Sequence, residues 1–126
     1  MKKTILIVDD SVVIRKIVRS TIVPLGFELI EANDGAEALS IIKKSFESIN
    51  LILMDWNMPK MNGFELLGTL KANRSYKDIP VIMVTTEGGK GNIVKAMQAG
   101  AANYILKPFN NDELVKKIMQ APGMAE

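Results

Sequence analysis

Acidic residues close two of the most apolar stretches of this chain. Asp9 and Asp10 follow the run Ile5 to Val8, and Asp55 follows the run Leu51 to Met54. Short apolar runs that end in a polar residue are typical of central strands in a parallel sheet, whose carboxyl ends form the crevice where ligands bind. We therefore expect the three carboxylates to meet at one edge of a buried sheet.

Clustered carboxylates call for a cation, because two unit charges about 4 Å apart repel by about 4 kcal/mol at an effective dielectric near 20. Thr85 closes the apolar run 81–84 and Lys107 closes the run 104–106, so both should lie at the same edge. Three acids, a hydroxyl and an ammonium together indicate a site for phosphoryl chemistry.

The composition excludes several other kinds of site. The chain has 126 residues, which suits a single domain from 1 to 126, and it contains neither cysteine nor histidine. Thiolate catalysis, imidazole metal ligands and a Ser-His-Asp triad are therefore excluded. The net charge of +2 is spread along the chain without a block of like charges, so no nucleic-acid partner is expected. The apolar runs are too short for a signal sequence or a membrane span, which predicts a cytoplasmic protein with no membrane contact.

Five short apolar runs alternate with five longer segments of helical periodicity, which favours a doubly wound α/β fold with a parallel sheet. Strands are predicted at about 4–9, 27–31, 51–55, 80–85 and 103–107. Helices are predicted from 12 to a stop near 24, and at about 35–46, 63–73, 89–99 and 110–121, followed by a short tail. Asp34 is the expected N-cap of the second helix, and Val12, Val13, Ile17, Val18 and Ile22 are the apolar residues of the first.

The order of these motifs resembles that of response-regulator receiver domains. In that family, acids follow the first and third strands, Ser or Thr follows the fourth, and Lys-Pro follows the fifth. Here the matching segments are Asp55-Trp56-Asn57-Met58-Pro59 through Gly63, then Val84-Thr85, then Lys107-Pro108-Phe109, and the resemblance spans roughly residues 4 to 120. It is strongest to stand-alone chemotaxis regulators. The resemblance implies a flavodoxin-like α/β fold, with five parallel strands in the order 2-1-3-4-5 and five helices.

The resemblance also implies a phosphoryl site. Asp55 would be the phosphoacceptor, and a carboxylate can serve as the nucleophile in aspartyl-phosphate chemistry. The implied cofactor is Mg²⁺, which prefers hard oxygen ligands. Its ligands would be Asp9, acting mostly through water, Asp10, Asp55 and the backbone carbonyl of Asn57. Lys107 would pair with Asp55 and with the phosphoryl oxygens, and would be joined to its proline by a cis bond.

A switch is implied as well. Thr85 would bond the phosphoryl group through its hydroxyl, and Tyr104 would move inward when Thr85 is drawn toward the phosphate. Taken alone, Thr85 could also be an ordinary β-branched residue of a strand, and Tyr104 an ordinary half-buried tyrosine of a strand. Asn57 and Glu87 match positions that tune hydrolysis of the acyl phosphate in this family. Thr86 departs from the small residue usual there, and its branched side chain could crowd the phosphoryl pocket.

The partners implied by the resemblance are a histidine kinase as phosphodonor, an output protein such as a flagellar motor switch component, and a phosphatase. The chain would be a monomeric signalling switch with self-catalysed phosphoryl transfer and slow autodephosphorylation, not an enzyme. Because no effector domain follows the fifth predicted helix, the output should be a protein surface. By resemblance that surface includes Lys90, Asn92, Ile93, Tyr104 and Lys117. The glycine-rich segment 88–91 should fray at the start of the fourth helix.

Other functions remain open. A phosphate sink, or a receiver that regulates a non-motor partner, would have the same sequence features. A flavodoxin-like electron carrier shares the fold, but flavin phosphate would be repelled by Asp9 and Asp10. A haloacid-dehalogenase-type phosphatase also uses an aspartyl nucleophile, Mg²⁺, a hydroxyl and a lysine. Its first-strand motif is Asp-x-Asp, whereas the two acids here are adjacent.

Overall fold

Five parallel strands form the sheet of this molecule. The computed structural model describes residues 2–58, 61–86 and 90–125. The strands are β1 (Thr4–Val8), β2 (Glu28–Ala32), β3 (Ile49–Asp55), β4 (Val81–Thr85) and β5 (Asn103–Leu106). They lie in the order β2-β1-β3-β4-β5, and each pair of neighbours is parallel. The predicted fold class and strand order are confirmed, and each strand begins and ends within two residues of its predicted position.

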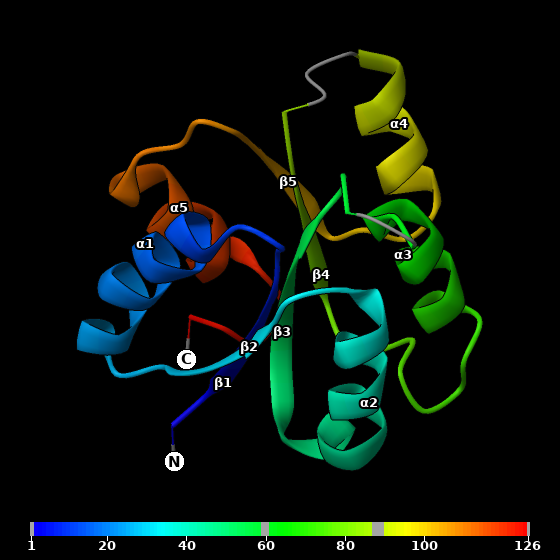
Figure 1. Cartoon of the computed structure of the whole chain (residues 1–126), viewed down its shortest axis with the longest axis horizontal. Coiled ribbons are helices and arrows are strands. Elements are labelled where there is room, and N and C mark those ends of the chain that lie inside the picture. Colours follow the sequence, from blue (N-terminus) through cyan, green and yellow to red (C-terminus); the bar gives the residue numbers. More distant parts are fainter. Residues whose placement is uncertain (1, 59–60, 87–89, 126) are drawn as a thin grey trace.

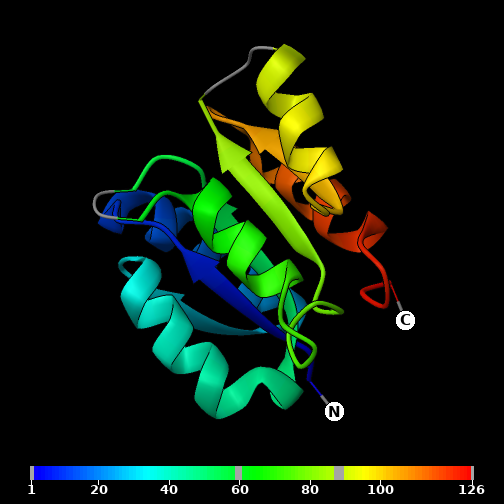
Figure 2. The ribbon, with the colours of Figure 1, turned by 90° about the vertical axis from the view of Figure 1, so that its right-hand side faces the viewer.

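Helices cover both faces of this sheet. The described residues form α1 (Val12–Ile22), α2 (Gly35–Ser45), α3 (Gly63–Lys71), α4 (Lys90–Gln98) and α5 (Asn111–Gln120), with short 3-10 turns η1 (Val23–Leu25) and η2 (Phe46–Ser48). Helices α1 and α5 lie on one face, and α2, α3 and α4 lie on the other (Figure 1). In the view turned by 90°, the second group lies in front of the strands (Figure 2). No helix among the described residues is both long and apolar enough to cross a membrane.

Side chains of β1 alternate between two hydrophobic cores. Leu6 and Val8 pack with residues of α2, α3 and α4, whereas Ile5 and Ile7 pack with residues of α1 and α5. Successive side chains of a strand point to opposite faces, so a sheet covered on both faces needs apolar residues at every position. This explains the continuous apolar runs in the sequence. The parallel register sets Val8 beside Met54 of β3, so the acids that follow these residues leave the sheet side by side.

Polar side chains fix the first turns of four helices. Ser11, Asp34, Asn62 and Asn110 each accept a hydrogen bond from the backbone N–H three residues further on. An N-cap of this kind is worth about 1 kcal/mol. The predicted cap at Asp34 is confirmed. The cap at Ser11 begins α1 directly after the two acids, and thereby sets the direction in which the chain leaves β1.

The apolar face of α1 is narrower than the sequence indicates. Val18 and Ile22 are buried, but Val12 and Val13 are 54% and 65% exposed. At 3.6 residues per turn, positions five and six before Val18 lie on the opposite side of the helix, away from the sheet. Val12 and Val13 are therefore surface residues next to the carboxyl edge of the sheet.

The residues after α5, which the sequence predicts to be a short tail, pack against the rest of the molecule. Ala121 and Met124 are buried, and both belong to the core formed with α1 and α5. Lys3 Nζ donates a hydrogen bond to the carbonyl of Gly123, which holds this segment against the start of β1. The segment closes the amino-end edge of the sheet, opposite the three acids.

Gly63 lies where the backbone of α3 approaches the end of β3. Its N–H donates to the carbonyl of Trp56 at 2.8 Å. A Cβ atom at this position would lie 2.0 Å from the backbone oxygen of Asp55, far inside van der Waals contact. Only glycine therefore lets α3 begin here without displacing the end of β3.

Replacing Gly63 by alanine should consequently destabilise the fold by about 1 to 3 kcal/mol, the usual cost of forcing atoms into a packed interior. Gly68 provides a matched control within the same helix, because a Cβ atom added there would meet no neighbouring atom within 4 Å. Gly68→Ala should stabilise the protein by up to about 1 kcal/mol. Urea unfolding of both variants measures this. Equal effects of the two substitutions would contradict the close approach.

Candidate functional site

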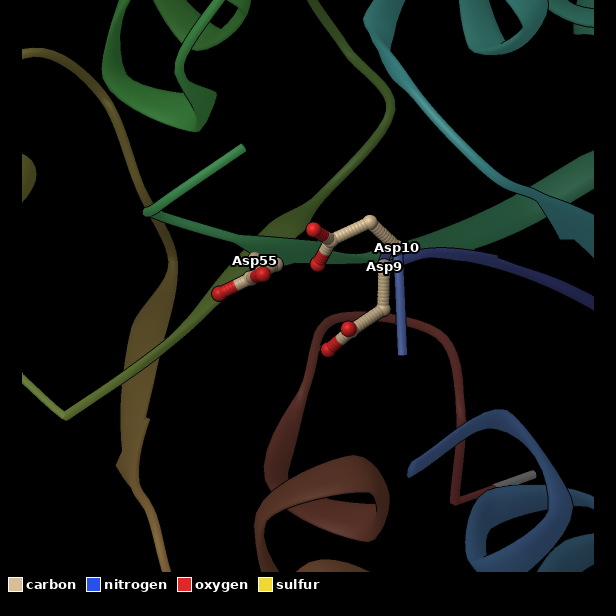
Figure 3. Close-up of side chains that lie close together, drawn as sticks. All are labelled: Asp9, Asp10 and Asp55. Atoms are coloured by element: carbon tan, nitrogen blue, oxygen red, sulfur yellow. The ribbon is translucent and has the colours of Figure 1, made fainter. Parts of the chain in front are cut away.

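Three carboxylates meet at the carboxyl ends of β1 and β3, as the sequence predicts. Asp9 and Asp10 follow β1, and Asp55 is the last residue of the neighbouring strand β3. One oxygen from each of the three lies within 4.8 Å of the others. Asp9 is fully buried, Asp55 is only 4% exposed and Asp10 is open to solvent. Figure 3 shows the three side chains gathered at this edge of the sheet.

Lys107 bridges two of these carboxylates. Its Nζ donates to Asp9 Oδ2 at 2.9 Å and to Asp55 Oδ1 at 3.3 Å. The backbone N–H of Lys107 donates to the carbonyl of Thr85 at 2.8 Å, which ties the lysine to the end of β4. The Lys107–Pro108 bond is cis, as the resemblance implies. The resemblance implies a pairing of Lys107 with Asp55 alone. In the structure, Lys107 Nζ lies closer to Asp9 than to Asp55.

Backbone groups supply the other contacts of the two buried acids. Ser11 N–H donates to Asp9 Oδ1 at 2.8 Å, and Asn57 N–H donates to Asp55 Oδ1 at 3.3 Å. Both donors lie two residues after the acid that they bind, so each loop folds back on its own carboxylate. These hydrogen bonds hold the carboxylates in place but do not neutralise their charge.

Burial and charge shift the ionisation of this site. Loss of solvent, followed by repulsion from Asp9, raises the pKa of Asp55 from 3.8 to about 6, although the charge and hydrogen bond of Lys107 and the N–H of Asn57 act against this. Burial of the ammonium by itself lowers the pKa of Lys107. The hydrogen bonds and charges of Asp9 and Asp55 outweigh burial and raise that pKa.

The charge balance of the site fits a divalent cation. With all three acids ionised, three negative charges face the single positive charge of Lys107, which leaves a net charge of −2. The donors are hard carboxylate oxygens, two of them held by backbone hydrogen bonds and the third open to solvent. Such a set suits Mg²⁺, which binds through one or two carboxylates and keeps several waters. The residues present therefore fit the ion that the resemblance implies.

The two residues of the predicted switch lie on adjacent strands. Thr85 ends β4 and is buried, and Tyr104 on the neighbouring strand β5 is half-buried. Lys117 of α5 lies over the ring of Tyr104, with its Nζ 4.7 Å from the ring centroid. Its Nζ also donates to Asn103 Oδ1 at 3.3 Å. Lys117 and Tyr104, both predicted for the partner surface, are therefore in direct contact.

The remaining predicted residues lie around these groups. Asn57 is exposed two residues after the end of β3, and Asn92 and Ile93 are half-buried on α4. Lys90 is the first residue of α4. Glu87 and the glycines at 88 and 89 lie outside the described residues. Thr86 is exposed.

Sequence reasoning missed a contact that the structure places behind the acids. Arg15 of α1 donates to the backbone carbonyl of Asp9 and to Glu31 of β2. In the sequence, Arg15 is one of several basic residues on the polar side of a helix. The contact could have been predicted only from the position of Glu31, an acid near the end of the strand that lies beside β1. That prediction requires the order of the strands to be known first.

The comparisons with known proteins agree with this geometry. The family described as the response regulator receiver domain matches residues 5–119. This chain belongs to that family, whose members are signalling switches. A chemotaxis protein CheY homologue of Campylobacter jejuni is 43% identical over 120 residues, which cover 94% of this chain and 92% of the relative.

Solved structures give the same result. The chemotaxis protein CheY4 of Vibrio cholerae matches with a TM-score of 0.88 and 35% identity, over 95% of this chain and 98% of that one. A chain in the CheX–CheY–BeF3–Mg²⁺ complex of Borrelia burgdorferi matches with a TM-score of 0.88 and 30% identity, over 93% of this chain and 87% of that one. The fold and the site together thus define a receiver domain similar to chemotaxis proteins of the CheY type.

The raised pKa of Asp55 predicts a pH-dependent stability in the absence of Mg²⁺. Because the pKa is higher in the folded protein than in the unfolded chain, this group stabilises the fold only at low pH, and that contribution is lost between about pH 4 and pH 6. Asp55→Asn does not titrate. Its unfolding free energy relative to the parent should therefore rise by about 2 kcal/mol from pH 4 to pH 7.

Urea unfolding of the two proteins across this pH range measures the effect. A Lys107→Met background supplies a control, because removing the lysine should move the transition above pH 6. A stability difference between parent and Asp55→Asn that stays constant with pH would contradict the assigned environment of Asp55.

Proposed function

We propose that this receiver domain accepts a phosphoryl group on Asp55 from a phosphohistidine of a partner histidine kinase, in a Mg²⁺-dependent reaction, and then changes which protein it binds in the control of chemotaxis. The observation that carries the proposal is the buried carboxylate of Asp55, which lies beside Asp9, Asp10 and the ammonium of Lys107. The family and its chemotaxis relatives support the same conclusion.

The proposed reaction needs no external base. A carboxylate oxygen of Asp55 forms a bond to phosphorus, and the bond from phosphorus to the histidine nitrogen of the donor breaks. At pH 7 the acceptor is mostly ionised, since its pKa is about 6. Phosphoryl transfer is accelerated chiefly by positioning and by neutralisation of charge. Lys107 is placed to pair with a phosphoryl oxygen, because it already contacts Asp55 Oδ1.

In this proposal Asp9, Asp10, Asp55 and the backbone carbonyl of Asn57 hold Mg²⁺, which would supply neutralisation of the phosphoryl charge. The resting protein has Lys107 between Asp9 and Asp55. Asp10 is open to solvent and lies outside that ion pair, so it offers the metal its most accessible oxygen. Slow autodephosphorylation would then depend on the residues at positions 57 and 87, the second of which lies outside the described residues.

The switch proposal rests on Thr85 and Tyr104. Thr85 is buried at the end of β4, one residue beyond Val84, which pairs with Asp55. This position suits a hydroxyl that bonds to a phosphoryl group on Asp55 and moves toward it. Strand β5 pairs directly with β4, which provides a short mechanical route from Thr85 to Tyr104. Inward movement of the Tyr104 ring would break its contact with Lys117.

Output is proposed to occur through α4, β5 and α5. Lys90, Asn92, Ile93, Tyr104 and Lys117 lie on these elements. Val94, Met97 and Leu106, which are exposed hydrophobic residues of α4 and β5, add apolar surface to the same elements. A flagellar motor switch component is the proposed partner, and a phosphatase is a further one. The Borrelia complex, in which a related CheY is bound to CheX, supports recognition of this fold by other proteins.

Incubation with acetyl phosphate and Mg²⁺ tests the acceptor. The parent should gain the mass of one phosphoryl group, and Asp55→Asn should gain none because an amide is a far weaker nucleophile than a carboxylate. Asp34→Asn is the matched control, since asparagine caps a helix as well as aspartate does. It should be phosphorylated like the parent.

Borohydride reduction and peptide mapping then locate the label. Label on Asp9 instead of Asp55 would overturn the assignment of Asp55 as the acceptor. In the host cell, Asp55→Asn should change the swimming reversal frequency. Unchanged swimming together with altered phosphorylation of a second receiver would instead indicate a phosphate sink.

A further inference from the structure

Arg15 connects the loop that carries the acids to the end of β2. Its Nη1 donates to the backbone carbonyl of Asp9, and also to Asn33 Oδ1 at 3.3 Å. Its Nε donates to Glu31 Oε1 at 3.1 Å. The side chain is only 14% exposed, so the guanidinium is held between α1 and β2 and is not a mobile surface group.

Asp9 is fixed through every polar atom that it has. Its N–H donates to the carbonyl of Ala32 at 3.1 Å, and its own carbonyl accepts from Arg15. Its two carboxylate oxygens accept from Ser11 N–H and from Lys107 Nζ. Of these four partners, Arg15 is the one that holds the peptide group leading to the next residue.

That peptide group joins Asp9 to Asp10. Peptide units are planar, so the direction of the Asp9 carbonyl sets the plane from which the Asp10 backbone continues. Asp10 is open to solvent, and its placement therefore depends on this backbone more than on packing. The guanidinium of Arg15, which is held by Glu31 and Asn33, thus fixes the backbone position from which the Asp10 side chain extends.

We infer that Arg15 is a positioning residue for the metal site: it orients Asp9 and Asp10 for Mg²⁺ through the Asp9 carbonyl, without touching the ion. The inference rests on the proposed function, because it assumes that these acids bind Mg²⁺. Partners that orient metal ligands typically contribute about 10- to 100-fold to metal affinity.

Charge alone predicts the opposite sign. A cation close to an anionic site repels Mg²⁺, so removing Arg15 should strengthen Mg²⁺ binding if the residue acts only through its charge. Removing a residue that positions the ligands should weaken binding instead. The direction of the change therefore decides between the two roles.

Arg19 provides a matched control. It lies one turn after Arg15 on α1 and makes two hydrogen bonds to Glu31 Oε2, at 2.9 and 2.8 Å. It thus shares the anchor of Arg15 but makes no described contact with Asp9. Loss of Arg19 removes the same charge and disturbs the same glutamate, while the carbonyl of Asp9 keeps its partner.

The test is calorimetric titration of MgCl2 into the parent, Arg15→Met, Arg15→Lys and Arg19→Met. Methionine keeps most of the aliphatic stem of arginine, and lysine keeps the charge but not the planar fork of donors. Both Arg15 variants should bind Mg²⁺ about tenfold more weakly, and Arg19→Met should bind like the parent or slightly more tightly. Raising Mg²⁺ should restore the rate of phosphorylation of Arg15→Met by acetyl phosphate.

Urea unfolding of each variant without Mg²⁺ shows whether the variant is folded. If Arg15→Met does not fold, the Mg²⁺ affinity of Arg15→Lys provides the test. Unchanged or tighter Mg²⁺ binding by the folded Arg15 variants would overturn the inference and leave the metal site intact. A parent that binds no Mg²⁺ would overturn the proposed function itself, and the inference with it.

Discussion

Repulsion among three carboxylates at one edge of the sheet is the constraint on which the rest of this structure depends. Asp9 and Asp55 are buried and lie with Asp10 within a few ångströms, and Lys107 offsets only one of their charges. Burial, followed by repulsion from Asp9, raises the pKa of Asp55, so the folded protein holds this carboxylate at a cost in free energy. A divalent cation bound to these oxygens would reduce that cost.

The fold holds these like charges together with backbone geometry. Strands β1 and β3 are parallel neighbours, so their carboxyl ends, and the acids there, emerge side by side. Helix α1 begins at the Ser11 cap directly after Asp10, and Gly63 lets α3 begin against the backbone of Asp55. Lys107 follows β5, which lies two strands away from β3 in the sheet. The apolar cores on both faces of the sheet supply the stability against which the repulsion acts.

Much of this arrangement could be predicted from the sequence, because strand ends in a parallel sheet converge on one edge. The positions of Asp9, Asp55, Thr85 and Lys107 followed from that rule, and helical caps such as Asp34 are local enough to be recognised. Contacts that depend on how helices rotate against the sheet could not be predicted in the same way. The Arg15 contact, the exposure of Val12 and the burial of Met124 all require the packed structure. The pairing of Lys107 with Asp9 needs side-chain positions that a motif does not encode.

Linkage between Mg²⁺ and folding tests the central claim most directly. The free energy of unfolding at pH 7 should be measured by urea titration over a range of Mg²⁺ concentrations, with Ca²⁺-free buffer and constant ionic strength. If one ion binds the folded site, that free energy should rise by about 1.4 kcal/mol for each tenfold increase in Mg²⁺ above the dissociation constant. The rise should be much smaller in Asp10→Ala. A parent protein whose stability is the same with and without millimolar Mg²⁺ would contradict the account.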